Sequence, residues 1–122
     1  DCMPSLGMLT INALAAADSV VIPTLPHYLS AKGLELLLRP VSKVKRQISP
    51  HLRIDGILMT MVMPRTNISK EIMVTVKSAY GQRIKVFDTQ IPHSIRAVEA
   101  TAEGKSIWCY DSQSRLIKKA SN

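Results

Sequence analysis

The 122-residue sequence predicts an α/β fold in which helices cover both faces of a parallel sheet. Short β-branched or apolar runs alternate along the chain with segments of helical periodicity, which is the pattern of strand–helix–strand units. Apolar residues make up 46% of the chain, enough for a core, although only 4% of the residues are aromatic. The length fits a single domain of ~100–200 residues.

The first two predicted helices differ in their polarity. A helix over residues 6–17 is apolar on nearly every side, so we expect it to be mostly buried, with Ser5 as its N-cap. A helix over residues 28–48 is amphipathic. Pro40 lies inside it, removes one backbone donor and disfavours helical geometry at Arg39, so we expect a kink or a break there.

Two further helices are expected in the second half of the chain. Residues 66–81 place apolar side chains on one face, with Asn67 as a plausible N-cap and Gly81 as the stop. Residues 93–104 predict a short helix that ends at Gly104. After this helix the sequence is less regular and ends in basic residues.

Three strands are predicted between these helices. The run at residues 19–24 is β-branched and ends in proline, and residues 53–62 form a second apolar run that only Gly56 weakens. Residues 83–92 form the third run. Ligands of open α/β sheets bind beyond the carboxyl ends of the strands, so the loops PTLPHY, MVMPRTN and TQIPHS are the places to search.

The second helix carries a basic stripe opposite its apolar face. The apolar positions are Leu34, Leu37, Leu38, Val41, Val44 and Ile48, and the basic ones are Lys32, Arg39, Lys43 and Arg46. Such a stripe can contact successive phosphates of a nucleic acid, or it can be the solvated face of an amphipathic helix. A formal charge of +7 favours anionic partners but fits a basic solvated surface equally well.

The sequence contains no recognisable motif for zinc binding, for a phosphate-binding loop or for a serine nucleophile. Cys2 and Cys109 are far apart, and the histidines have no metal-ligand spacing, so a zinc site is not expected. Neither a glycine-rich phosphate loop nor a G-x-S-x-G elbow is present. There is also no apolar run of about 18 residues and no basic signal-peptide start, so we predict a cytoplasmic protein.

The first residues have the character of a fourth strand end. Asp1 is followed by CMPSLG directly before the first helix. A carboxylate at the end of a hydrophobic strand can hold Mg²⁺ beside a nucleotide phosphate, directly or through water. The other interpretation is an ordinary exposed terminal residue.

Taken in order, these motifs resemble the ParA/Soj family of chromosome- and plasmid-partitioning ATPases. DCMPSLGMLTINALAAAD resembles the family's D-x-P-P-S-L-G and L-x-T-x-N-A-L-x-A-A-D, which begin at the Walker B aspartate. GILMTMVMPRTNISKEI and VFDTQIPHSIRAVEATAEGKSI resemble its later strands and their loops. The match covers residues 1–111, predicted as the C-terminal portion of the nucleotide-binding domain, and leaves 112–122 as an irregular basic tail.

The resemblance implies a partial doubly wound P-loop NTPase-like parallel sheet flanked by helices, without the N-terminal strands and the phosphate loop. It implies ATP and Mg²⁺ as cofactors, a homodimer, nonspecific DNA and a ParB-like protein as partners, and a nucleoid-associated location in the bacterial cytoplasm. By position, Asp1 matches the residue that holds Mg²⁺ through water, and Pro4, Ser5, Leu6 and Gly7 match the turn that follows. The resemblance also implies nucleotide contacts by Pro4, Met61, Pro92 and His93. It implies DNA contacts by Arg39, Lys43, Arg46 and Arg65.

The sequence also departs from the family. The K-G-G-x-G-K-T loop is absent, Met3 replaces a proline, and the end after WCYD is unlike the family's last helix. We therefore expect a fragment of a partitioning ATPase that is inactive by itself, because phosphoryl transfer depends on groups placed around the phosphates. The alternatives are a nonspecific nucleic-acid-binding remnant and a non-functional truncated product.

Overall fold

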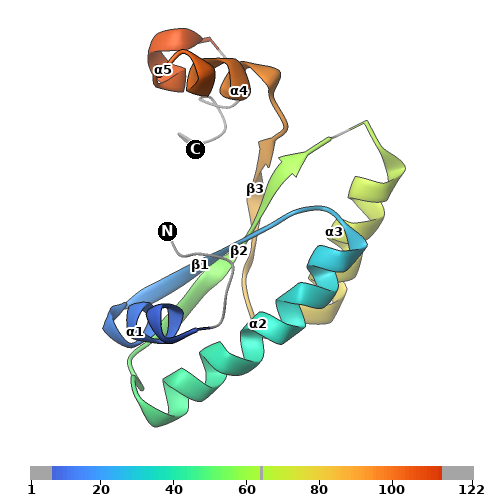
Figure 1. Cartoon of the computed structure of the whole chain (residues 1–122). Coiled ribbons are helices and arrows are strands. Elements are labelled where there is room, and N and C mark those ends of the chain that lie inside the picture. The colour runs from blue at the N-terminus through green and yellow to red at the C-terminus, as the bar shows by residue number, and fades with distance from the viewer. Residues whose placement is uncertain (1–6, 64, 114–122) are drawn as a thin grey trace.

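A three-stranded parallel sheet forms the centre of the molecule (Figure 1). The computed structural model describes residues 7–63 and 65–113. Its strands are β1 (Ser19–Thr24), β2 (Arg53–Val62) and β3 (Val86–Pro92), in the spatial order β1-β2-β3. Both neighbouring pairs are parallel, which confirms the predicted fold class.

Five helices accompany the sheet in the described part of the chain. They are α1 (Met8–Ala16), α2 (Tyr28–Gln47), α3 (Asn67–Tyr80), α4 (Ile95–Ala102) and α5 (Ile107–Tyr110). Figure 1 shows α2 and α3 on one side of the sheet, and α4 with α5 beyond the end of β3. No helix among the described residues is both long and apolar enough to cross a membrane.

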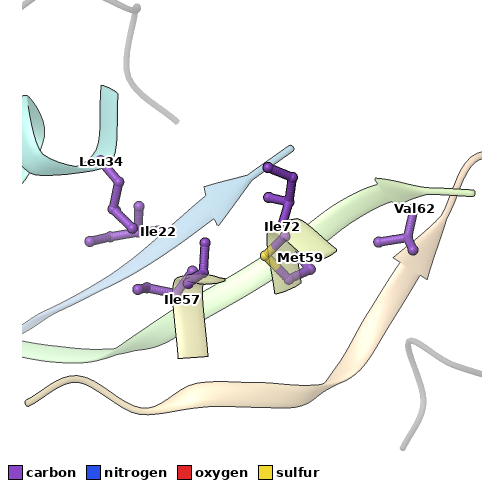
Figure 2. Close-up of a cluster of buried hydrophobic side chains, with 7 residues drawn as sticks. Ile22, Leu34, Ile57, Met59, Val62 and Ile72 are labelled. Carbon is purple, nitrogen blue, oxygen red and sulfur yellow. The ribbon is translucent and has the colours of Figure 1, made fainter. Parts of the chain in front are cut away.

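The main core lies between the sheet and the pair α2 and α3 (Figure 2). Its buried side chains are Ile22, Leu34, Ile57, Met59, Val62, Ile72 and Val76. A second cluster joins α1 to the C-terminal half of α2 through Leu14, Val41, Val44 and Leu52. These apolar positions of α2 are the ones that its periodicity predicts.

The helices do not cover both faces of the sheet within the described chain, so that prediction is wrong there. Leu34 of α2 and Ile72 of α3 belong to one core cluster, which places both helices on the same face. Two right-handed crossovers that advance across the sheet in the same direction put their helices on the same side. On the other face, Val21 of β1 is 47% exposed.

Three irregularities in the pairing of β2 affect which side chains reach the core. The register of β1 with β2 shifts between Ile54 and Gly56, and that of β2 with β3 shifts between Ile57 and Met59 and again between Met59 and Val62. Strict alternation would send residues an odd number apart to opposite faces. Because of the shift between Met59 and Val62, these two side chains both pack in the core cluster. A plain alternating pattern could not predict this.

The first helix is shorter and more exposed than predicted. It begins at Met8, with Gly7 at the N-cap position, while Ser5 lies outside the described residues. Only Leu14 of this helix is buried, and Leu9 is 78% exposed. The helix is apolar on all sides, which led to the prediction that it is mostly buried. That prediction is wrong, because only one side of α1 packs against the second core cluster.

The expected break at Arg39 does not occur. The second helix continues from Tyr28 to Gln47 with Pro40 inside it. Leu34 and Val41, on either side of Pro40, pack into two different core clusters, and this packing outweighs the single backbone hydrogen bond that proline removes.

Smaller differences concern the ends of elements in the second half. Thr66, and not Asn67, occupies the N-cap position of α3, while Gly81 ends the helix as predicted. The third strand begins at Val86, three residues later than expected. Gly104 follows α4 with a φ of +65°, as a stop should, and the short α5 after it was not predicted.

Candidate functional site

The carboxyl ends of β2 and β3 lie level with each other. Val62 is paired with Pro92, and the backbone N–H of His93 donates to the carbonyl oxygen of Val62 at 3.0 Å. Thr24, the last residue of β1, is paired with Met59, so β1 ends before β2 reaches its carboxyl end. The edge that β2 and β3 build is the side of an open α/β sheet on which ligands bind.

Met61 stands at this edge in a left-handed backbone conformation. Its φ is +52°, and among the described residues no other non-glycine has a positive φ. This conformation disfavours side chains with a Cβ, and such residues are often found at functional sites. The side chain of Met61 is 53% exposed, while its neighbour Val62 is buried. The strained residue therefore turns an apolar side chain outward beside Pro92 and His93.

The predicted nucleotide residues fall into two groups. The structure brings Met61, Pro92 and His93 together at the carboxyl edge, as their positions after the strands predict. Pro4 and Asp1, the predicted metal ligand, lie outside the described residues. Their assignment stays a prediction.

The loop after β2 is held by a pair of hydroxyl groups. Thr66 Oγ1 donates to the carbonyl oxygen of Met63 at 3.0 Å and lies 2.8 Å from Oγ of the buried Ser69. This turn leads directly into α3 and leaves Arg65 exposed at the carboxyl edge.

The basic stripe of α2 lies mostly at the other end of the molecule. The helix starts after the carboxyl end of β1 and returns to the amino end of β2, so Lys43 and Arg46 lie toward the amino end of the sheet (Figure 1). Arg65 follows the carboxyl end of β2. The structure therefore does not bring all the predicted DNA-binding residues to one place.

A small polar cluster joins α4 to α5 beyond β3. Tyr110 Oη donates to Glu99 Oε2 at 3.1 Å, and Arg96 Nη1 lies 3.8 Å from the same oxygen. The hydrogen bond to Glu99 is the main cause that raises the pKa of Tyr110 above its ordinary value, and Arg96 opposes it. Sequence reasoning missed this cluster, because the residues come from separate helices, one of them unpredicted.

The described residues offer no ready-made metal site. No group of three or more histidine, cysteine, aspartate or glutamate side chains gathers anywhere in residues 7–63 or 65–113. The edge at Met61 and Pro92 fits the apolar base of a nucleotide better than its phosphates, because it presents apolar side chains and a histidine.

This parallel sheet places the chain in the class of P-loop NTPase-like α/β proteins. It superposes on cobyrinic acid a,c-diamide synthase from Mycobacterium smegmatis, solved with an ATP analogue and magnesium, with a TM-score of 0.70 and 35% identity over 77% of this chain and 37% of that one. Apo McdA from Cyanthece has the same fold, with a TM-score of 0.77 over 97% of this chain and 48% of that one, at 17% identity. A family model described as an AAA domain matches residues 1–54.

Sequence relatives narrow the class further. The sporulation initiation inhibitor protein Soj of Bacillus subtilis is 46% identical over 94% of this chain and 45% of its own length. The chromosome partitioning protein ParA of Myxococcus xanthus is 41% identical over 94% of this chain and 40% of its own length. The chain is thus a homologue of the ParA/Soj proteins, as its motifs predict, and it spans less than half the length of these relatives.

Proposed function

We propose that this chain is the part of a ParA/Soj-type partitioning ATPase that supplies the metal-side and base-side contacts of the nucleotide site. The observation that carries the proposal is the level edge formed by β2 and β3, where His93 is bonded to Val62 at 3.0 Å. Ligands of open α/β sheets bind at that edge. The related synthase of known structure was solved with an ATP analogue and magnesium, which supports a nucleotide and Mg²⁺ as the ligands.

Each predicted residue has a distinct role in this proposal. Asp1 holds Mg²⁺ through water, and Pro4 shapes the turn beside it. Met61 and Pro92 provide apolar surface for the adenine, and His93 offers a hydrogen-bonding side chain at its rim. The exposed position of Met61 supports this role, because a side chain held out of the core by a strained backbone is available to a ligand.

The chain by itself is not expected to turn over ATP. Phosphoryl transfer needs positively charged and backbone groups around the β- and γ-phosphates, and this sequence contains no K-G-G-x-G-K-T loop. The activities of a whole partitioning protein follow by homology as part of the proposal: ATP-dependent dimerisation, nonspecific DNA binding and hydrolysis stimulated by a ParB-like partner at the nucleoid.

A second candidate function is nonspecific nucleic-acid binding without nucleotide chemistry. The exposed cations on one face of α2 support it, since binding to phosphates needs no catalytic group. In this case the chain binds duplex DNA but does not restore ATP turnover in any context.

A chimaera separates these functions. The 122 residues replace the matching segment of Bacillus subtilis Soj, and phosphate release from Mg²⁺–ATP is measured. We expect turnover that is lost in Asp1→Asn and kept in Asp18→Asn, an exposed carboxylate before β1. A folded chimaera without turnover, or turnover by the isolated chain, would contradict the proposal.

A further inference from the structure

One side of α2 carries exposed leucines and cations together. Leu29 is 80% and Leu36 is 62% exposed, and both belong to a series of residues that are alternately three and four positions apart. All members of this series are exposed and are here called the outer face of α2: Leu29, Lys32, Leu36, Arg39, Lys43 and Arg46. Val41 and Val44, which are buried, fall on the opposite side of the helix. The outer face therefore points away from the core.

The neighbouring helix α3 extends this surface. Leu34 of α2 and Ile72 of α3 pack in one core cluster, so both helices cover the same face of the sheet and turn their other sides outward (Figure 1). On α3, Val74 is 65% exposed, and the exposed Lys70 and Glu71 lie about one turn before it. The two helices thus form a layer whose outer side presents both apolar and charged groups.

The charge on the outer face is mainly positive. Glu35 is the one acidic residue of α2, and its Oε1 lies 2.9 Å from Nη2 of Arg39, so these two charges offset each other. Lys32, Lys43 and Arg46 form no ion pair with a carboxylate in the described part of the chain. Three positive charges of this face are therefore available to an anionic partner.

The apolar and charged groups are distributed unevenly along the helix. Leu29 and Leu36 lie with Lys32 in its N-terminal half, and the other cations of the outer face lie in its C-terminal half. Along the axis, Leu29 and Arg46 are roughly 25 Å apart at about 1.5 Å per residue. Ile48, which follows the helix and is 55% exposed, adds an apolar side chain near Arg46. Apolar contacts are thus offered at both ends of the helix, with charges between them.

This combination fits an anionic lipid surface better than a nucleic acid or a protein. A nucleic-acid backbone provides partners for the cations but none for Leu29 and Leu36. Protein interfaces are depleted in lysine, which occurs twice on the outer face. At the boundary between lipid headgroups and acyl chains, leucine side chains can enter the apolar layer, while lysine and arginine extend their charged ends to the headgroup phosphates.

We propose that the outer face of α2 binds the surface of membranes that contain anionic phospholipids. Leu29 and Leu36 insert at the boundary of the acyl chains, and Lys43 and Arg46 contact the headgroup phosphates. The association is reversible, because a few apolar side chains and cations bind far more weakly than a spanning helix. This function goes beyond the nucleotide and DNA functions proposed above and depends on neither.

Flotation of the full chain with vesicles measures this association. We expect binding to vesicles of phosphatidylglycerol and phosphatidylcholine in a ratio of about 1:2, at about 100 mM KCl. Binding to vesicles of phosphatidylcholine alone is expected to be at least about tenfold weaker, because each cation gains from an anionic surface. Equal binding to both kinds of vesicle, or no binding to the mixed ones, would overturn the proposal.

The leucines distinguish insertion from attraction by charge alone. Leu29→Ser with Leu36→Ser is expected to weaken binding to the mixed vesicles by about tenfold or more at unchanged charge, because less apolar surface leaves water. Val98→Ser, at a 64% exposed residue of α4, is the matched control and should leave binding unchanged. Unchanged vesicle binding by the double variant, with an intact circular dichroism melt, would show a purely electrostatic surface of the kind that suits a nucleic acid, and the proposal would fail.

Two lysines of α2 separate the outer face from the net charge. Lys45 is exposed but does not belong to the outer face. Lys43→Glu and Lys45→Glu change the charge of the chain equally, and we expect vesicle binding to fall by about tenfold or more in the first and by about twofold or less in the second. Equal losses would mean that net charge determines binding, which contradicts a role for this face.

A tryptophan at the insertion site reports its depth. Trp108 is the single tryptophan of the chain, so Leu29→Trp together with Trp108→Phe places the fluorophore on the outer face alone. We expect its emission to shift to shorter wavelength on the mixed vesicles and to be quenched by brominated acyl chains, since an interfacial helix buries its apolar side about 5–10 Å deep. Bound protein without shift or quenching would rule out insertion. The ATP turnover of the chimaera does not depend on any of these results.

Discussion

The backbone N–H of His93 donates to the carbonyl oxygen of Val62 at 3.0 Å and so joins the ends of β3 and β2. This bond follows directly from the parallel register, in which Val62 is paired with Pro92. It holds the start of the loop after β3 against the last residues of β2, which include the strained Met61.

The left-handed backbone of Met61 predicts opposite effects for two substitutions. Met61→Val is expected to lower the free energy of unfolding by about 1–2 kcal/mol, because a β-branched side chain tolerates positive φ poorly. Met61→Gly is expected to be neutral or stabilising. Urea unfolding measures both, and Met63→Val, at another exposed methionine without positive φ, is the matched control.

Two glycines with contrasting surroundings give a paired prediction. A Cβ at Gly56 would lie 2.7 Å from Phe87 Cε2 and 2.8 Å from the carbonyl oxygen of Lys85. Gly56→Ala is therefore expected to destabilise the fold by about 1–3 kcal/mol, and Phe87→Leu to rescue only part of the loss, because the backbone contact remains.

Gly33 has no atom within 4 Å of such a Cβ and lies inside α2. Gly33→Ala is expected to stabilise the protein by about 1 kcal/mol through the helix propensity of alanine. Equal effects of the two substitutions in thermal melts would contradict the close approach of β3 to Gly56.

Replacing the proline inside α2 should strengthen the helix. Pro40→Ala restores a backbone N–H that can donate to the carbonyl of Leu36, and we expect a gain of about 1–3 kcal/mol in the free energy of unfolding. Ser42→Ala, two residues further on the same helix, should change it by much less. A loss of stability in Pro40→Ala would show that the helix geometry depends on the proline ring.

The hydrogen bond from Tyr110 to Glu99 predicts a pH effect at the α4–α5 contact. It raises the pKa of Tyr110, so this contact stabilises the fold fully below the ordinary tyrosine value of about 10 and ceases to do so as the pH rises through the raised pKa. Glu99→Ala is expected to lower the pKa of Tyr110 in an absorbance titration of tyrosinate, with Tyr28 and Tyr80 replaced by phenylalanine.

Glu71→Ala, an exposed glutamate on α3, is the control and should leave this titration unchanged. If Glu99→Ala left it unchanged as well, the hydrogen bond would not form in solution.

Much of the fold could be predicted because its signals are local. The periodicity of α2 predicts an apolar face, and Leu34, Val41 and Val44 on it are buried while Leu37 and Leu38 are partly buried. Ile48, the last residue of the predicted face, follows the helix and is 55% exposed. Proline and glycine predict several ends correctly, such as Gly81 after α3. The sequence also predicted that the loops after β2 and β3 lie at one edge, and the pairing of Val62 with Pro92 agrees, because parallel strands end at a common edge.

Other features depend on packing between distant segments. The exposure of α1 and the continuity of α2 through Pro40 are set by what each helix contacts, which propensity does not contain. A register shift in β2 and the positive φ of Met61 occur between Met59 and Val62. These two residues are three positions apart, yet both side chains pack in the same core cluster. Local patterns carry no information about such compromises.

The sequence by itself determined the class of fold, the order of its elements and the kinship with the ParA/Soj proteins, because periodicity and ordered motifs are properties of the chain. Only the tertiary structure decided that Lys43 and Arg46 of α2 lie away from Arg65, with Arg39 paired to Glu35 while Lys43 and Arg46 form no ion pair within the described chain. The physical reason is the crossover itself: a helix that returns from the carboxyl end of one parallel strand to the amino end of the next carries its last residues to the opposite end of the sheet.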